Sequence, residues 1–129
     1  MRLLIDSHVW VWLTASPGRL NPATFTLLSE PGNEVLLSIA SCWELAIKQS
    51  LGRLAFPGDI VTRLPELVAE QGIALLPITL AHAMAVAALP YHHRDPFDRL
   101  IIAQSQLEGL SLVTADPAIE PYGVQLIPA

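Results

Sequence analysis

The sequence predicts an α/β fold, a three-layer α/β/α arrangement with a mostly parallel central sheet. Short apolar runs alternate with longer segments of helical spacing, which is typical of strands connected by helices. Strands covered by helices on both faces form parallel sheets. The chain has 129 residues, near the commonest domain size, and shows no linker, repeat or low-complexity segment. Residues 1–129 are therefore expected to form a single domain.

Five apolar runs are the predicted strands. The first, beginning at Met1, stops at Asp6, and Pro77 interrupts the third near its end. Because helical segments separate successive strands, we expect the strands to run in the same direction. The predicted strands cover residues 1–5, 35–38, 73–78, 110–114 and 124–127.

The predicted helix boundaries follow from capping and helix-breaking residues. Asn21 is a good N-cap with Pro22 at the first helical position, and glycines follow the ends of three later helices. Pro65 is expected to tighten or break the first turn of its helix. The predicted helices cover residues 8–14, 22–30, 41–51, 59–71, 80–89 and 95–108.

The composition indicates an apolar surface and argues against binding to nucleic acid by charge alone. Hydrophobic residues make up 52% and charged residues 15% of the chain, against roughly 25% charged in an average protein. We therefore expect contact with a second copy, another protein, or both. The net charge of −5 disfavours diffuse attraction to nucleic acid. A nucleic-acid enzyme stays compatible if metal ions supply positive charge, with phosphate contacts from Arg94, Arg99, Lys48 and Arg53.

Cysteine usage and the N-terminal residues suit a cytoplasmic protein. Cys42 is the single cysteine, which excludes an internal disulfide and a cysteine cluster for zinc or iron–sulfur. Met1-Arg2 leads into only three apolar residues before Asp6, so neither a signal peptide nor a membrane span is expected there. No other apolar run approaches the ~20 residues needed to cross a bilayer.

Four carboxylates lie where a strand or loop gives way to a helix. Asp6 follows the first strand, Glu44 lies inside the helix after the second, Asp98 lies near the start of the helix that ends at residue 108, and Asp116 follows the fourth strand. The carboxyl ends of parallel strands share one edge, where ligand crevices form. Acidic groups gathered there would repel one another unless a divalent cation neutralised them. The pattern favours a Mg2+ site.

Each of these acids also has a structural explanation. The four residues ending at Glu44 fit a capping box. Asp98 fits the third helical position after an N-cap and Pro96, while Asp6 and Asp116 each fit an N-cap. Lys48, one turn after Glu44, is expected to pair with it. What favours a site is that all four acids would lie on the same edge of the sheet.

The histidine pair raises a zinc alternative. His92 and His93 lie beside Asp95, but adjacent histidines point in different directions and no third His or Cys lies at ligand spacing. We expect His92, His93 and Arg94 to form a polar loop near the acids, within reach of a substrate phosphate.

Four segments, in the same order along the chain, resemble the motifs of PIN-domain nucleases. The third closely resembles the motif of the branch that includes VapC-type toxins, and the match runs from residue 1 to about residue 127. The segments are residues 3–8 (LLIDSH), 38–48 (SIASCWELAIK), 93–104 (HRDPFDRLIIAQ) and 112–116 (LVTAD).

The resemblance implies catalytic and metal-binding roles for the acidic quartet, which would hold Mg2+ or Mn2+. Its members are Asp6, Glu44, Asp98 and Asp116. Thr114 matches a supporting hydroxyl position, and Ser7 has a similar expected part. Asp98 is assigned as the ligand of the third motif because it lies three residues before Ile101, whereas Asp95 is interpreted as the N-cap near the site.

The implied function is metal-dependent endoribonuclease activity by the toxin of a type II toxin–antitoxin pair. A carboxylate-bound metal would activate water for phosphodiester hydrolysis, with Glu44 or Asp116 as proton acceptor. The resemblance also implies a homodimer and a cognate antitoxin that covers the acidic groove. DNA as the substrate and a non-catalytic interaction module are the alternatives.

Two other Mg2+-dependent classes fit poorly. A receiver domain needs two adjacent acids after the first strand, where this chain has Asp6-Ser7. A haloacid-dehalogenase-type phosphatase needs a second Asp two residues after the first, where this chain has His8.

Overall fold

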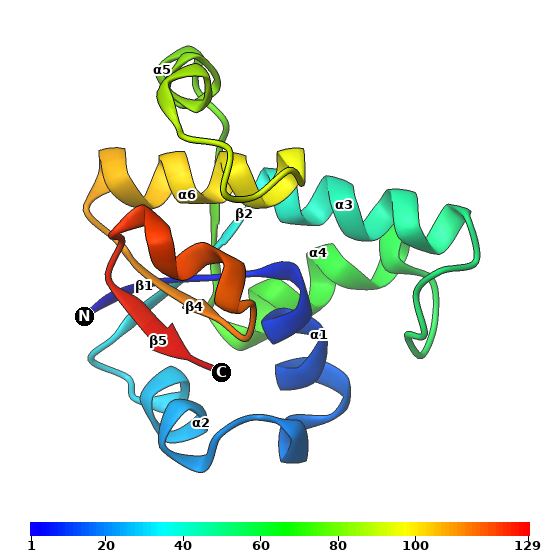
Figure 1. Cartoon of the computed structure of the whole chain (residues 1–129). Coiled ribbons are helices and arrows are strands. Elements are labelled where there is room, and N and C mark those ends of the chain that lie inside the picture. Colours follow the sequence, from blue (N-terminus) through cyan, green and yellow to red (C-terminus); the bar gives the residue numbers. More distant parts are fainter.

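The computed structural model describes residues 1–129 and has a five-stranded sheet at its centre (Figure 1). The strand order is β3-β2-β1-β4-β5, and every neighbouring pair is parallel. The predicted α/β class is confirmed, and the sheet is parallel throughout. The strands are β1 (Arg2–Ile5), β2 (Glu34–Ser38), β3 (Ala74–Leu76), β4 (Ser111–Thr114) and β5 (Leu126–Pro128).

Helices cover both faces of this sheet, so the predicted three layers are present. The helices are α1 (Ser7–Ala15), α2 (Pro22–Ser29), α3 (Ile39–Ser50), α4 (Ile60–Gln71), α5 (Leu80–Ala85) and α6 (Pro96–Glu108). Three short 3-10 helices, η1 (Pro17–Arg19), η2 (Val86–Ala88) and η3 (Pro117–Tyr122), complete the chain.

The alternation of side chains along β1 divides the core into two clusters. Leu3 and Ile5 are fully buried against residues of α1, α2, α3 and α4. Leu4, between them, points to the other face and packs in the cluster that contains residues of α6 and η3. This period of two with apolar residues on both sides is what a strand between two helical layers requires.

The start of α3 differs from the prediction. The helix begins at Ile39 rather than Ser41, because the Ser38 side chain caps it by accepting a hydrogen bond from the Ala40 amide at 3.0 Å. Glu44 therefore lies in the second turn of the helix. The capping-box explanation of Glu44 is wrong.

Other boundaries shift for local reasons. Helix α4 continues through Pro65, with Ile60, Leu64 and Val68 buried along one face to offset the hydrogen bond that proline removes. The helix predicted over 80–89 is divided into α5 and the tighter η2. The third strand is shorter than predicted and ends before Pro77.

The sheet topology fixes where a ligand crevice lies. The chain builds β1, β2 and β3 outward in one direction, and β4 then returns to the other side of β1. The carboxyl ends of β1 and β4 therefore form the switch point at which open α/β sheets bind ligands. Asp6 and Asp116 follow these two strands. None of the helices has the length and apolar character needed to cross a membrane.

Two tryptophans provide a test of the packing. Trp10 is fully buried, stacks on Phe56 at 5.5 Å between ring centroids, and donates from Nε1 to Gln71 at 2.9 Å. Trp10→Ala is expected to lower the free energy of unfolding by about 3–5 kcal/mol in urea denaturation. The matched control is Trp43→Ala, whose side chain is 59% exposed and should change the value far less. Equal losses in the two variants would contradict this core assignment.

Candidate metal centre

The four acids come from four different elements and meet at the carboxyl end of the sheet. Asp6 directly follows β1, and Asp116 lies two residues after β4. Asp98 is in the first turn of α6, and Glu44 is in α3. A cleft of about 280 Å³ is lined by Asp6, Asp98 and Asp116, together with His8, Trp12 and Ala115. Glu44 does not line this cleft, but its charge acts on both Asp6 and Asp98.

Asp6 is fixed by two donors and is 5% exposed. One carboxylate oxygen accepts from the Val9 amide at 2.8 Å, which caps α1, and the other accepts from the Thr114 hydroxyl at 2.5 Å. The Thr114 oxygen in turn accepts from the Asp116 amide at 3.0 Å. Burial raises the pKa of Asp6 despite these hydrogen bonds. Capping and a place in the cleft are therefore compatible roles for this residue.

Glu44 is 4% exposed and is held by groups from two helices. Its Oε1 accepts from the Ser7 hydroxyl at 2.7 Å, and its Oε2 lies 2.8 Å from Lys48 Nζ. The predicted pairing of Lys48 with Glu44 is confirmed. Ser7 comes directly after Asp6 but supports Glu44 rather than its neighbour, and this contact joins the start of α1 to α3.

Asp95 and Asp98 have different roles at the start of α6. The Asp95 carboxylate accepts from the amides of Phe97 at 2.8 Å and Asp98 at 3.3 Å, so Asp95 is the N-cap, as predicted. Burial, followed by the charges of Asp95 and Glu44, raises the pKa of Asp98 to about 7. The centre therefore holds more negative charge than the surrounding protein neutralises.

Asp116 is the most exposed of the four acids, with 36% of its side chain accessible. Its Oδ1 accepts from the Ala118 amide at 3.0 Å and so caps η3. Burial acts to raise its pKa, but the hydrogen bonds from Ala118 and His93 outweigh burial and lower the pKa overall. This acid consequently stays ionised more readily than Asp98 does.

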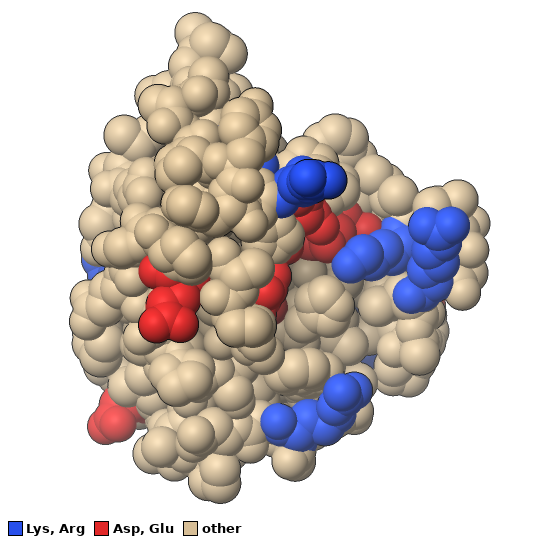
Figure 2. Space-filling model, viewed as in Figure 1, with Lys and Arg blue, Asp and Glu red and all other residues tan.

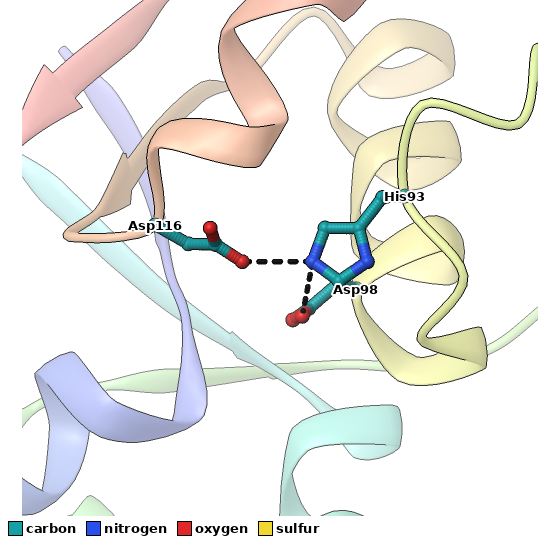
Figure 3. Close-up of side chains that lie close together, drawn as sticks. All are labelled: His93, Asp98 and Asp116. Atoms are coloured by element: carbon teal, nitrogen blue, oxygen red, sulfur yellow. Dashed lines mark hydrogen bonds and ion pairs between the residues drawn. The ribbon is translucent and has the colours of Figure 1, made fainter.

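His93 lies between two of the acids, as Figure 3 shows. Its Nε2 is 2.7 Å from Asp116 Oδ2 and 3.0 Å from Asp98 Oδ2. The sequence predicts His93 in a polar loop near the acids, but nothing in it signals the contacts of Nε2 with Asp98 and Asp116. The neighbouring His92 turns toward Tyr122, with 5.3 Å between the ring centroids. The two histidines do not converge, which agrees with the argument against a zinc pair.

Arg99 is buried within the protein and does not lie free to contact a substrate phosphate. It is 4% exposed, and its guanidinium lies over the ring of Tyr91. The expected phosphate contact from Arg99 is wrong, because the guanidinium is enclosed and used within the protein. It donates to the carbonyl oxygens of Val86, Leu89, Pro90 and His93. Arg99 thereby ties the segment that carries His93 to α6.

The distribution of charge on this face is visible in Figure 2. Acidic groups lie near the middle and at the left of the face, and most of the basic groups in view lie to the right of the central ones. Arg53 and Arg94 are both exposed.

The donor set fits a hard divalent cation. The cleft offers carboxylate oxygens, which Mg2+ and Mn2+ prefer, and no thiolate. One potential ligand atom from each of His93, Asp98 and Asp116 lies within 4.8 Å of the others. Burial and the charges of neighbouring acids raise the pKa values of Asp6 and Asp98.

Comparison with known proteins identifies the family. The PIN domain model matches residues 3–123. The chain belongs to the PIN domain family. It is 33% identical over 121 residues to Ribonuclease VapC22 of Mycobacterium tuberculosis, and this match covers 93% of the chain and 91% of the relative.

Solved structures of toxin–antitoxin complexes show the same fold. VapBC2 from Rickettsia felis, bound to a promoter DNA fragment, matches with a TM-score of 0.74 and 13% identity over 99% of this chain and 98% of that one. DNA-bound VapBC from Salmonella typhimurium matches with a TM-score of 0.72 and 14% identity over the same shares. At these identities, the likeness establishes the PIN fold alone.

Asp98 gives a prediction on stability and pH. Because its pKa is raised to about 7, the folded protein keeps a proton that the unfolded chain has already lost, so Asp98 lowers stability as pH rises from about 4 to 7. In chelator at pH 8, Asp98→Asn should raise Tm by about 3–6 °C, and the gain should shrink at pH 4.5. Differential scanning fluorimetry measures both values.

The control for this experiment is the removal of an acid outside the centre. Glu66→Gln removes an exposed carboxylate that pairs with Arg63 on α4 and should change Tm little at either pH. A lower Tm for Asp98→Asn at both pH values would show that the carboxylate stabilises the metal-free fold.

Proposed function

We propose that the chain is a metal-dependent endoribonuclease and the toxin of a type II toxin–antitoxin pair. The observation that carries the proposal is the convergence of four acids at the β1/β4 switch point, where burial and neighbouring charges raise the pKa of Asp98 to about 7. The similarity to Ribonuclease VapC22 over nearly the whole chain supports RNA as the substrate. The VapBC complexes among the structural neighbours support an antitoxin partner.

The acidic residues would hold Mg2+ or Mn2+ at the cleft. Asp6, Asp98 and Asp116 line it, and Glu44 adds its charge from behind. When bound, the metal lowers the pKa of water and compensates charge on the phosphoryl oxygens. The protein's own contribution is to hold the carboxylates in place before substrate arrives, through donors such as Thr114 on Asp6 and Ser7 on Glu44.

Substrate binding would use the basic side chains that remain free at the surface. Arg53 and Arg94 are exposed, whereas Arg99 is enclosed and Lys48 is paired with Glu44. The exposed cations would contact RNA phosphates on either side of the scissile bond. No element that reads base edges is evident, so these contacts position the strand without specifying its sequence.

Apolar surface would be covered by a homodimer partner and the antitoxin. The exposed large apolar side chains include Trp43, Leu80, Met84 and Tyr91. This agrees with the low charge content of the chain. The alternative of a purely structural interaction module is weakened by Glu44, which lies in the second turn of α3 as a buried acid that caps nothing.

Loss of cleavage on removal of single carboxylates tests the function. Asp6→Asn and Asp98→Asn should each reduce cleavage of a mixed structured RNA pool in Mg2+ or Mn2+ by more than about 100-fold, because removing even outer partners of metal ligands typically costs 10- to 100-fold. Chelator should abolish the wild-type activity. Product formation is followed on gels and by 5′-end mapping.

Controls separate the metal site from folding and from contamination. Circular dichroism must show that both variants are folded, and Glu66→Gln should cleave like wild type because Glu66 lies exposed on α4, outside the centre. Retention of cleavage in both Asn variants would refute the site. DNA of the same sequences as the RNA pool is tested in parallel. Preferential cleavage of that DNA would show that the chain is a DNA nuclease instead.

A further inference from the structure

We propose that His93 is a positioning residue of the acidic centre, whose Nε2–H group holds the carboxylate of Asp116 beside that of Asp98, in the place from which the two take up a divalent cation. His93 itself is not a ligand. The inference rests on the proposed function, because it concerns the metal that the acids would bind. It assigns a role to a side chain that the acidic quartet does not include.

The hydrogen bonds of the imidazole fix which nitrogen carries the hydrogen. The Asp95 amide donates to His93 Nδ1 at 3.0 Å, so Nδ1 presents its lone pair. In a neutral imidazole the other nitrogen then bears the hydrogen. Nε2 is therefore a donor to Asp116 Oδ2 at 2.7 Å, and Asp98 Oδ2 lies 3.0 Å from the same nitrogen.

The same geometry argues against His93 as a metal ligand. Coordination through Nε2 needs the lone pair of that nitrogen, so the hydrogen would have to move to Nδ1. A hydrogen on Nδ1 would point at the Asp95 N–H group and break that bond. The closeness of the three side chains in Figure 3 thus reflects a hydrogen bond from His93 to Asp116, with Asp98 beside it, rather than three ligands around one ion.

The backbone of His93 is also fixed, so the ring has a defined direction. Its amide donates to the Tyr122 hydroxyl at 2.8 Å, and its carbonyl accepts from Arg99 Nη1 at 3.3 Å. The Tyr122 hydroxyl in turn donates to the Pro90 carbonyl at 2.7 Å. The ring is only 14% exposed. A loop residue held by two elements, η3 and α6, is suited to place one hydrogen-bond donor accurately.

Asp116 is the acid that most needs such a donor. It lies on a turn after β4 and has the most exposed side chain of the four. The Ala118 amide holds its Oδ1, and His93 holds its Oδ2. Each carboxylate oxygen has two lone pairs, so one remains for a cation after the hydrogen bond is made.

The other acids show the same arrangement. The Thr114 hydroxyl donates to Asp6, and the Ser7 hydroxyl donates to Glu44. In both cases the donor belongs to a different element from the acid. His93 completes this pattern for Asp116, since without it that acid would receive no side-chain donor from elsewhere in the chain.

Two substitutions distinguish the contribution of Nδ1 from that of Nε2. In His93→Asn the amide oxygen can accept from the Asp95 amide as Nδ1 does, but no group reaches the carboxylates. In His93→Gln the longer side chain can place an N–H donor near the position of Nε2. Mn2+ binding is measured without RNA by electron paramagnetic resonance of the free ion, alongside Tm in chelator.

His93→Asn is expected to weaken Mn2+ affinity by about 10-fold or more, within the range seen for outer partners of metal ligands. His93→Gln should restore most of that affinity. The control His92→Asn should bind Mn2+ like wild type, because His92 packs on Tyr122 and does not contact the acids. All folded variants should keep Tm within a few degrees of wild type.

Several outcomes would overturn the proposal. Wild-type or tighter Mn2+ binding by His93→Asn would show that the histidine does not position the carboxylates. Equal weakening in the Asn and Gln variants together with a large fall in Tm would assign His93 to folding alone. Absence of both Mn2+ binding and RNA cleavage in wild type would instead refute the proposed function.

Discussion

Mutual repulsion among buried carboxylates is the constraint to which the rest of this structure is arranged. Asp6 and Glu44 are almost completely buried at the end of an apolar sheet, and their charges act on each other and on Asp98. Such a cluster persists only where donors compensate part of the charge. Those donors come from strand, helix and loop residues alike, among them Thr114, Ser7 and His93.

Several residues hold the fold and the centre together through one contact. Asp6 caps α1 and accepts from Thr114, which joins the ends of β1 and β4 at the switch point. Arg99 is buried under the segment 86–93 and fixes the carbonyl of His93. A helix cap or a buried guanidinium that looks structural in isolation therefore also determines where the acids lie. Asp6 and Asp116 are helix caps that also line the cleft.

Local patterns in the sequence predicted those features of the fold that depend on residues close together in the chain. The strands, the Asp95 cap and the Glu44–Lys48 pair follow from spacing of a few residues. The bridge from His93 to Asp116 joins residues 23 apart, and no periodicity signals such a contact. The prediction of a phosphate contact from Arg99 was wrong for the same reason. Its four carbonyl acceptors lie near it only once the loop is folded over α6, which the sequence does not reveal.

The chain has few cationic side chains available to pair with the acids of the centre. The chain has seven Lys and Arg residues. Arg2 and Arg63 pair with surface acids, Arg19 lies over Trp12, and Arg99 is enclosed. Lys48 neutralises one acid of the centre, Glu44. Burial raises the pKa of both Asp6 and Asp98, and the hydrogen bonds that Thr114 and Val9 donate to Asp6 lower its pKa only in part. Under the proposed function, a divalent cation would supply positive charge to these acids and leave the exposed arginines for the substrate.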